Sequence, residues 1–182
     1  MTKRISALAA AVCVGLAASV VTASAQETAN NPYTTAIKAQ AERIRGLVLK
    51  SAEKVPEEKL AFKPTPEVRS FGSLLGHIAD ANRLICGLAK GEKPEYTPVH
   101  EKKTTRAELI AALKESEAFC DEVFTSLTDA NGTEQVEVFG GKQPKLAVMA
   151  FNNNHVWEHY GNLVTYMRTK NIVPPSSERA PQ

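Results

Sequence analysis

Apolar residues recur at intervals of three and four in four separate stretches of the chain, which is the spacing of an amphipathic α-helix. The first stretch begins near Pro32, a residue suited to the first turn of a helix, and stops at Pro56. The second follows Ser70, a good N-cap residue, and ends near Gly91. The segments between the helices are polar and contain several prolines, which predicts loops there.

The third and fourth stretches also carry start and stop signals. Thr105 and Glu108 have the spacing of a capping box, which predicts that a helix begins there. The fourth helix is expected over residues 144–170, with Asn171 closing it in a left-handed conformation. Between these two helices, residues 135–139 (QVEVF) alternate enough for one short strand. Four amphipathic helices and almost no strand predict an all-α protein, a four-helix bundle.

The first 25 residues have the pattern of a secretory signal peptide. Lys3 and Arg4 precede a run of small and apolar residues, and the run ends in an A-x-A cleavage signal at residues 23–25. We therefore expect the protein to be exported to the periplasm or the extracellular space. The predicted organisation is then a signal peptide (1–25), a polar linker (26–31), the bundle (32–173) and a disordered tail (174–182).

Cleavage of the signal would change the charge balance and the cysteine count. The whole chain has 22 basic and 20 acidic residues, and Lys3 and Arg4 leave with the signal, so 20 of each sign remain. A neutral chain without a basic block argues against nucleic acid as a partner, and no other apolar run is long enough to cross a membrane. Cys86 and Cys120 remain, either as a disulfide or as two buried thiols.

The fourth helix contains the sequence HVWEH at residues 155–159. His155 and His159 are four residues apart, so both lie on one face of the helix and could bind one metal ion. His77 lies on the apolar side of the second helix and is the expected third ligand, whereas His100, in a charged loop, is a weaker candidate. The histidines belong to a stripe that we expect to face the core: Phe151, His155, His159, Asn162 and Tyr166.

The same five residues also match H-x-x-E-H, the motif of inverted zinc proteases. That class needs a third, acidic ligand well downstream, and the only acidic residue after His159 is Glu178, beyond the predicted end of the helix. Glu158 also points about 100° away from His159 around the helix. We therefore expect Glu158 on a helix flank and set the protease hypothesis aside.

The segments FKPTPEVRSFGSLLGHIADAN (62–82), HVWEHYGNLVTYMR (155–168) and NIVPPSS (171–177) together resemble the DinB superfamily of DinB/YfiT-like metalloenzymes. The resemblance implies an up-down-down-up bundle with a long crossover between the second and third helices. It implies a divalent metal ion bound by His77, His155 and His159. Members of the family often form dimers, so a homodimer is a possible assembly. Members of this family use the open metal position for thiol transfer or isomerisation, and others resemble metal-dependent hydrolases.

Two hypotheses for function follow. The first is an exported enzyme, a metal-dependent hydrolase or group (thiol) transferase that acts on a small molecule of unknown identity. The second is a non-catalytic metal-binding or stress-related binding module, because no carboxylate is clearly placed as an acid or base. Zinc or nickel is the expected ion, since imidazole suits both. Asn162 could orient a ligand, and Asp80 could accept a hydrogen bond from a ligating imidazole.

Overall fold

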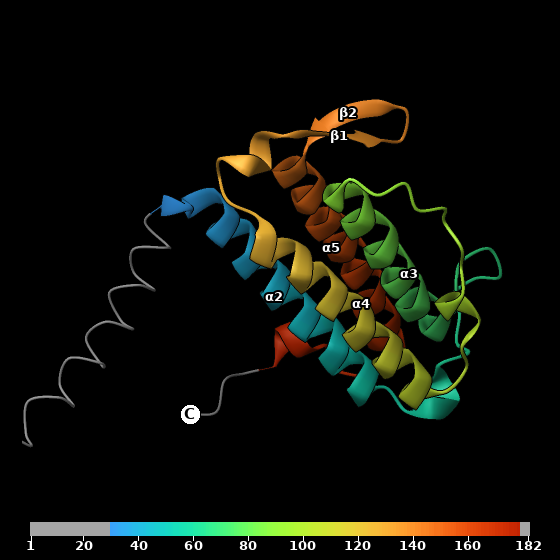
Figure 1. The fold of residues 1–182 in the computed structure, drawn as a ribbon. Helices are drawn as coiled ribbons and strands as arrows, with labels where there is room; N and C mark the ends of the chain where they lie inside the picture. The colour runs from blue at the N-terminus through green and yellow to red at the C-terminus, as the bar shows by residue number, and fades with distance from the viewer. Residues whose placement is uncertain (1–29, 179–182) are drawn as a thin grey trace, which may run out of the picture.

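In the computed structural model, which describes residues 30–178, four long helices form an all-α bundle (Figure 1). Helix α2 spans Pro32–Lys54, α3 spans Phe71–Lys90, α4 spans Arg106–Ser126 and α5 spans Lys145–Thr169. The predicted fold class is therefore confirmed. The predicted signal peptide lies outside the described residues. None of the described helices is both long enough and apolar enough to cross a membrane.

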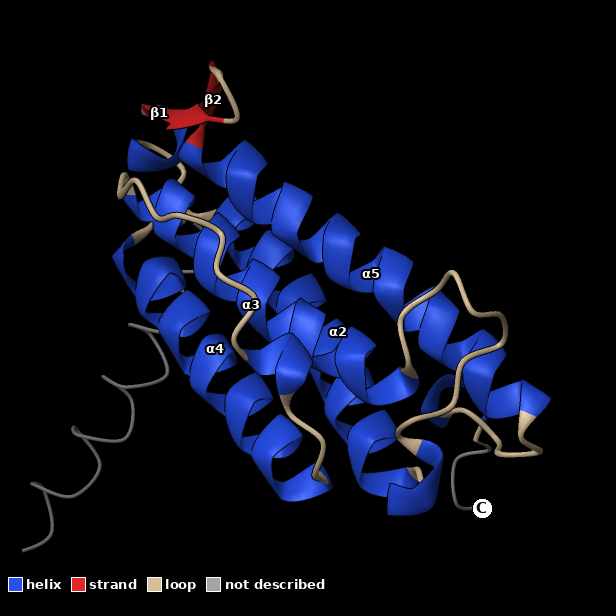
Figure 2. Ribbon diagram, turned by 90° about the vertical axis from the view of Figure 1, so that its right-hand side faces the viewer, coloured by secondary structure: helices blue, strands red, loops and turns tan. Residues whose placement is uncertain are grey.

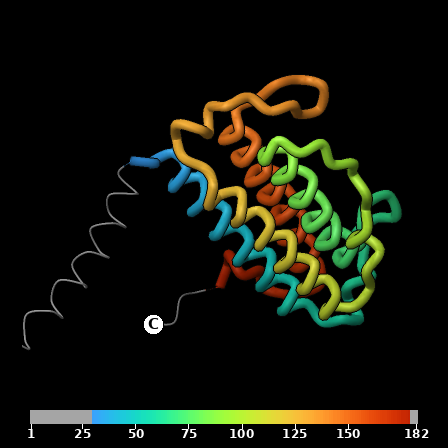
Figure 3. Tube along the Cα trace, in the orientation of Figure 1, coloured from blue at the N-terminus to red at the C-terminus, as the bar shows by residue number. Residues whose placement is uncertain are grey.

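The helices have the up-down-down-up arrangement. Helices α3 and α4 run in one direction and α2 and α5 in the other (Figure 3). Helix α2 contacts α5, and α3 packs against both α4 and α5. Because α3 and α4 are parallel neighbours, residues 91–105 must return along the bundle between them, and Figure 3 shows this crossover beside α3.

The predicted helix termini form through the expected local interactions. The side chain of Ser70 accepts a hydrogen bond from the backbone N–H of Ser73 at the start of α3. Thr105 and Glu108 make the complete capping box at the start of α4. Asn171 has φ of 58° just after α5, the left-handed conformation expected there. These local signals explain why the helix boundaries could be predicted closely.

A two-stranded antiparallel hairpin lies across one end of the bundle (Figure 2). Strand β1 (Gln135–Val138) matches the predicted strand, and β2 (Gly141–Pro144) was not predicted. The side chains of β1 alternate between exposed and buried, whereas those of β2 are nearly all exposed, so β2 has no apolar pattern to detect.

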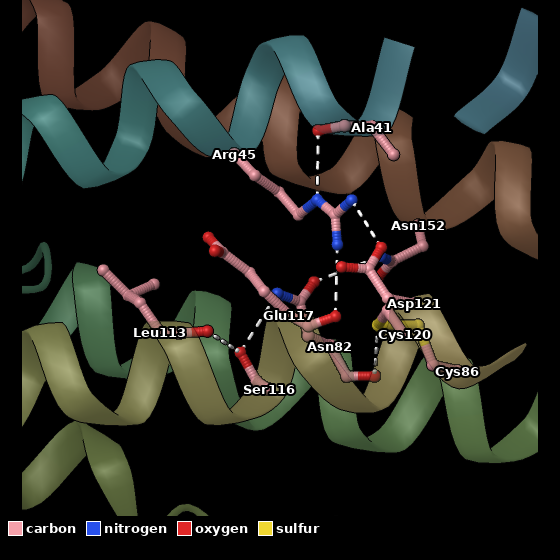
Figure 4. Close-up of a disulfide and its surroundings, with 10 residues drawn as sticks. All are labelled: Ala41, Arg45, Asn82, Cys86, Leu113, Ser116, Glu117, Cys120, Asp121 and Asn152. Atoms are coloured by element: carbon pink, nitrogen blue, oxygen red, sulfur yellow. Dashed lines mark hydrogen bonds and ion pairs between the residues drawn. A yellow bond between two sulfur atoms is a disulfide. The ribbon is translucent and has the colours of Figure 1, made fainter. Parts of the chain in front are cut away.

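The core consists of two apolar clusters separated by a layer of buried polar side chains. One cluster lies toward the hairpin and contains Val136, Val148 and Met149, and the other lies toward the opposite end and contains Leu75, Leu109 and Leu163. In the layer between them, Asn82 donates to Ser116 from α3 to α4, and Asn152 donates to Asn82 from α5 (Figure 4). Asn82 thus connects α3 to both α4 and α5 by hydrogen bonds at one level of the bundle.

Cys86 and Cys120 form a disulfide that joins α3 to α4 (Figure 4). Their Cα atoms are 5.4 Å apart, inside the range that a disulfide requires. The sequence left a disulfide and two free thiols as alternatives, and the structure has the disulfide.

The chain after α5 differs from the predicted disordered tail. Residues Pro175–Ser177 form a short 3₁₀-helix, and Pro175 is buried. The backbone N–H of Ser176 donates to the hydroxyl of Tyr160, and Glu178 pairs with Lys54 of α2. Prolines stop the α-helix as expected, but the segment then packs against α2 and α5, so the prediction is wrong for residues 174–178; residues 179–182 lie outside the described part.

Candidate metal centre

Three histidines from two helices meet beside the core. His77 comes from α3, and His155 and His159 come from adjacent turns of α5, which packs against α3. One ligand nitrogen from each ring lies within 4.8 Å of the other two. The structure therefore brings together the three residues that the sequence predicts as ligands, although 78 positions separate His77 from His155.

The arrangement of these nitrogens fits a divalent transition metal ion. The Nε2 atoms of His155 and His159 are 3.0 Å apart. Two nitrogens bound tetrahedrally to zinc are separated by roughly 3.4 Å, given Zn–N distances near 2.0–2.1 Å. The two Nε2 atoms are each other's hydrogen-bond partners, and the Nδ1 atom of each ring is buried without a partner among the described residues, so each ring turns its Nε2 toward the shared position.

The surroundings keep the α5 histidines uncharged. Burial, together with the neighbouring His159 and His77, lowers the pKa of His155 to about 4. Burial and His77 likewise lower the pKa of His159 to about 4. Both rings are therefore neutral at physiological pH, which is the form that donates a lone pair to a metal ion.

A carboxylate that the sequence did not single out contacts this cluster. Glu101 Oε1 lies 2.7 Å from His77 Nδ1 and accepts a hydrogen bond of 2.5 Å from the Tyr96 hydroxyl. Arg69 donates to both oxygens of Glu101, at 3.1 and 3.3 Å. Burial alone would raise the pKa of Glu101, but the hydrogen bonds from Arg69, Tyr96 and His77 outweigh it and lower the pKa to about 2. Glu101 is thus a carboxylate anion.

Glu101 sits on a tight turn that α3 holds in place. The turn is a 3₁₀-helix, His100–Lys102, within the crossover. The buried carboxylate of Asp80 accepts hydrogen bonds of 3.0 Å from the backbone N–H groups of His100 and Glu101. Asp80 therefore binds the turn, and not an imidazole of the cluster as one hypothesis had it. His100 stands beside Asp80 and outside the three-histidine group.

A cleft of about 970 Å³ opens next to His159. It lies between residues 63–70 and helix α5, and Arg69, Glu101 and Asn162 contribute to its walls. A small molecule could reach the histidine cluster from this side. Asn162 lines the cleft about one helical turn after His159. This position is compatible with the ligand-orienting role considered for it.

The stripe that contains the histidines was predicted to face the core, and only some of its residues do. Phe151 is exposed and Asn162 is exposed, whereas His159 and Tyr166 are buried. The residues at the centre of the buried face are Met149, Asn152, Val156, Leu163 and Met167. The histidines therefore lie at the edge of the core, where they are shielded and still border the cleft. Glu158 is exposed, as expected for a flank residue.

Comparison with known proteins gives a consistent picture of the fold. A DinB-like protein from Bacillus cereus superposes with a TM-score of 0.64 and 19% identity, over 72% of this chain and 89% of that one. A DinB-like protein from Bacillus subtilis gives 0.63 and 22%, over 79% and 99%. A mycothiol-dependent maleylpyruvate isomerase gives 0.60 and 15%, over 71% of this chain and 60% of the isomerase. At these identities the likeness shows the fold alone.

A search of curated proteins finds no match. The family model of the DinB superfamily matches residues 40–163, which include all of α3 and α4, most of α2 and α5, the crossover and the three clustered histidines. This match covers more than half of the chain and agrees with the resemblance carried by the sequence motifs. The chain therefore belongs to the DinB superfamily.

Proposed function

We propose that this protein binds one divalent transition metal ion, zinc or nickel, through His77, His155 and His159. The observation that carries the proposal is the convergence of three imidazole nitrogens within 4.8 Å, two of them on rings held neutral by burial. Three neutral ligands leave the full charge of the ion in place, and such an ion supplies Lewis acidity to a ligand at its open position.

The location of the cleft supports an enzyme that acts on a small molecule. The cleft beside His159 has room for one, and its wall carries Lys63 and Arg69 as cationic groups. The chain's own residues would bind and orient the substrate there, within reach of the ion. We propose hydrolysis or group transfer as the reaction, and the fold shared with a mycothiol-dependent isomerase keeps a thiol among the candidate ligands.

A non-catalytic metal-binding module is the second candidate, and one observation favours it. The carboxylate nearest the cluster, Glu101, already accepts from Arg69, Tyr96 and His77, and its pKa of about 2 makes it a poor proton acceptor at neutral pH. The described part of the cluster thus offers no free general base, and a reaction would need the ion or the substrate to provide one.

Export to the periplasm or the extracellular space is also part of the proposal. It is supported by the signal-like pattern of residues 1–25 and by the Cys86–Cys120 disulfide, since disulfides persist in oxidising compartments. Expression of the full chain in a bacterial host should place the protein outside the cytoplasm, with a mature N-terminus at Gln26. A cytoplasmic product that retains residues 1–25 would overturn this point.

The metal site is tested by measuring metal content after repletion with zinc or nickel. Wild-type protein should hold about one equivalent, and His77→Ala, His155→Ala and His159→Ala should each lose most of it. His100→Ala is the matched control, because His100 lies nearby and outside the cluster, and it should keep the metal. Wild-type protein without stoichiometric metal would refute the site. Turnover of ester, amide or thiol-transfer substrates would then separate the enzyme from the binding module.

A further inference from the structure

The proposed metal site includes a histidine, His77, whose ring must be turned correctly for its nitrogen to face the α5 pair. The side chain of His77 is only 13% exposed, and its ring centroid lies 5.2 Å from that of His155 and 4.8 Å from that of His159. Its Nδ1 atom is already engaged by Glu101 and by the Tyr96 hydroxyl at 2.9 Å. Only Nε2 is then left for an ion.

The chemistry of Glu101 determines which nitrogen of His77 carries the hydrogen. Both oxygens of Glu101 already accept hydrogen bonds, from Arg69 Nε, Arg69 Nη2 and the Tyr96 hydroxyl, so Glu101 faces His77 as an acceptor. The 2.7 Å contact therefore requires a hydrogen on His77 Nδ1, which leaves Nε2 as a bare lone pair. A ligating histidine that donates its other N–H to a carboxylate is fixed in tautomer and orientation and is a more basic ligand.

We infer that Glu101 is the positioning residue of the histidine cluster, which orients His77 so that Nε2 faces His155 and His159. This inference rests on the proposed metal site and adds to it a residue from a third segment of the chain. The described structure thus joins α3, α5 and the crossover in one site.

The acceptor positions of Glu101 favour an orienting role over a role as general base. A carboxylate has about four lone-pair positions. Four donor contacts occupy Glu101, namely Arg69 Nε, Arg69 Nη2, the Tyr96 hydroxyl and His77 Nδ1. Three of these contacts fall on Oε1, the oxygen that contacts His77, and only the one from Arg69 Nε falls on Oε2, so the oxygen nearest the cluster is already fully occupied by donors.

The turn that carries Glu101 is attached to α3 by residues on both sides of His77. Asp80, which holds the turn by two backbone N–H groups, lies three residues after His77 on α3. Gly76, directly before His77, allows the backbone of His100 to approach α3, because a Cβ at Gly76 would stand 2.2 Å from the His100 carbonyl oxygen. Both anchors of the turn therefore flank the histidine that Glu101 contacts.

A purely structural role for Glu101 is the alternative. In that case Glu101 would serve only to pair with Arg69 and so tie the crossover to residues 63–70. The two roles predict different results when each partner of the pair is removed separately. Loss of Arg69 leaves the carboxylate beside His77, and loss of Glu101 does not.

The test compares metal binding by Glu101→Ala, Glu101→Gln and Arg69→Gln, with Glu67→Ala as a matched control in the same cleft. Zinc affinity is measured by competition with a chelator, and the absorption spectrum of bound cobalt(II) reports the ligand geometry.

Glu101→Ala should weaken zinc binding about 10- to 100-fold and alter the cobalt spectrum. Glu101→Gln retains one acceptor oxygen and should fall between wild type and Glu101→Ala, and it also serves if the alanine variant does not fold. Arg69→Gln should weaken binding by no more than a few-fold, and Glu67→Ala should match wild type.

Two kinds of failure are distinguishable. Wild-type protein that takes up no zinc would refute the metal site itself. Zinc affinity and a cobalt spectrum that stay unchanged in the Glu101 variants, while His77→Ala abolishes binding, would overturn the positioning role and leave the site intact. Equal losses in Arg69→Gln and Glu101→Ala would assign Glu101 the structural role and would overturn the inference as well.

Discussion

Gly76 of α3 and His100 of the crossover are in backbone contact. A Cβ built on Gly76 would lie 2.2 Å from the His100 carbonyl oxygen and 2.6 Å from the Glu101 nitrogen. Both neighbours are backbone atoms and cannot move aside by a change of rotamer. The absence of a side chain at position 76 is therefore what lets the crossover lie against α3 at the level of the histidine cluster.

Gly76→Ala should push the crossover away from α3. We expect a loss of about 1–3 kcal/mol in the free energy of unfolding, typical of overpacking, together with weaker zinc binding because Glu101 moves with the turn. Urea denaturation and chelator competition measure the two effects. The control is Gly46→Ala on α2, where nothing lies within 4 Å of the added Cβ, and a gain of about 0.5–1 kcal/mol is expected because alanine is the better helix former. Equal stability of the two variants would contradict this account.

Asp80→Ala should destabilise the protein more than an ordinary surface change. The substitution leaves the N–H groups of His100 and Glu101 without their acceptor, and the side chain of Asp80 is only 3% exposed. We expect a loss of about 2–4 kcal/mol in urea denaturation, since hydrogen bonds to charged groups are worth about 1.5–3 kcal/mol each. Glu115→Ala is the control: Glu115 is an exposed carboxylate on α4 that lines a surface groove together with Asp80 and His100, and its loss should stay within about 0.5 kcal/mol of wild type. Similar values for both variants would show that the turn does not depend on Asp80.

Glu117 of α4 should make stability fall as the pH rises. Burial raises the pKa of Glu117 to about 7, with the cation of Arg45 opposing and the charge of Asp121 adding to the shift (Figure 4). The folded state therefore prefers the protonated acid. Its stabilising contribution is complete below the ordinary carboxyl pKa near 4.5 and is lost as the pH rises through 7.

The loss attributable to Glu117 is at most about 3 kcal/mol, from about 1.4 kcal/mol for each unit of pKa. Thermal or urea unfolding between pH 4.5 and 8 measures it in wild type and in Glu117→Gln, which mimics the uncharged form. The variant should show a flatter profile and exceed wild type in stability at pH 8. Parallel profiles for the two proteins would mean that Glu117 does not titrate in this range.

Reduction of the Cys86–Cys120 disulfide should cost on the order of 3–4 kcal/mol. The bond links residues 34 positions apart, and closing a loop of that length restricts the unfolded chain by roughly this amount. Urea denaturation with and without dithiothreitol gives the value. A Cys86→Ala/Cys120→Ala double variant is the control, and its stability should not respond to reductant. A wild-type protein that is equally insensitive would indicate that the bond is not formed in solution.

The helices and the histidine cluster could be predicted because their signals are local or periodic. Ser70, Thr105 and Glu108 have side chains that cap a helix within three residues of their own position. His155 and His159 share a helix face by spacing alone. The position of His77 on the apolar side of α3 then sufficed to bring it to the same place, since apolar faces must meet in the core.

Glu101 could not be predicted, because nothing near it in sequence distinguishes it from the other acidic residues of the crossover. Its place depends on long-range contacts, with Arg69 32 positions away and His77 24 positions away. The one usable signal lies on the partner helix, where a glycine and an aspartate flank His77. The tail after Pro174 was missed for a similar reason, since Ser176 is held by the hydroxyl of Tyr160 on another element.

The disulfide has a further consequence for the crossover. Because Cys86 and Cys120 are linked, residues 86–120 form a covalently closed ring, and the whole crossover with Glu101 belongs to it. A single proteolytic cut in the crossover would open this ring without releasing a fragment, so the nicked protein would migrate as one chain until reductant is added. Such a nick would free the segment that carries Glu101 while the disulfide keeps α3 and α4 joined. The contact between Glu101 and His77 could then be lost while the helix bundle stays folded.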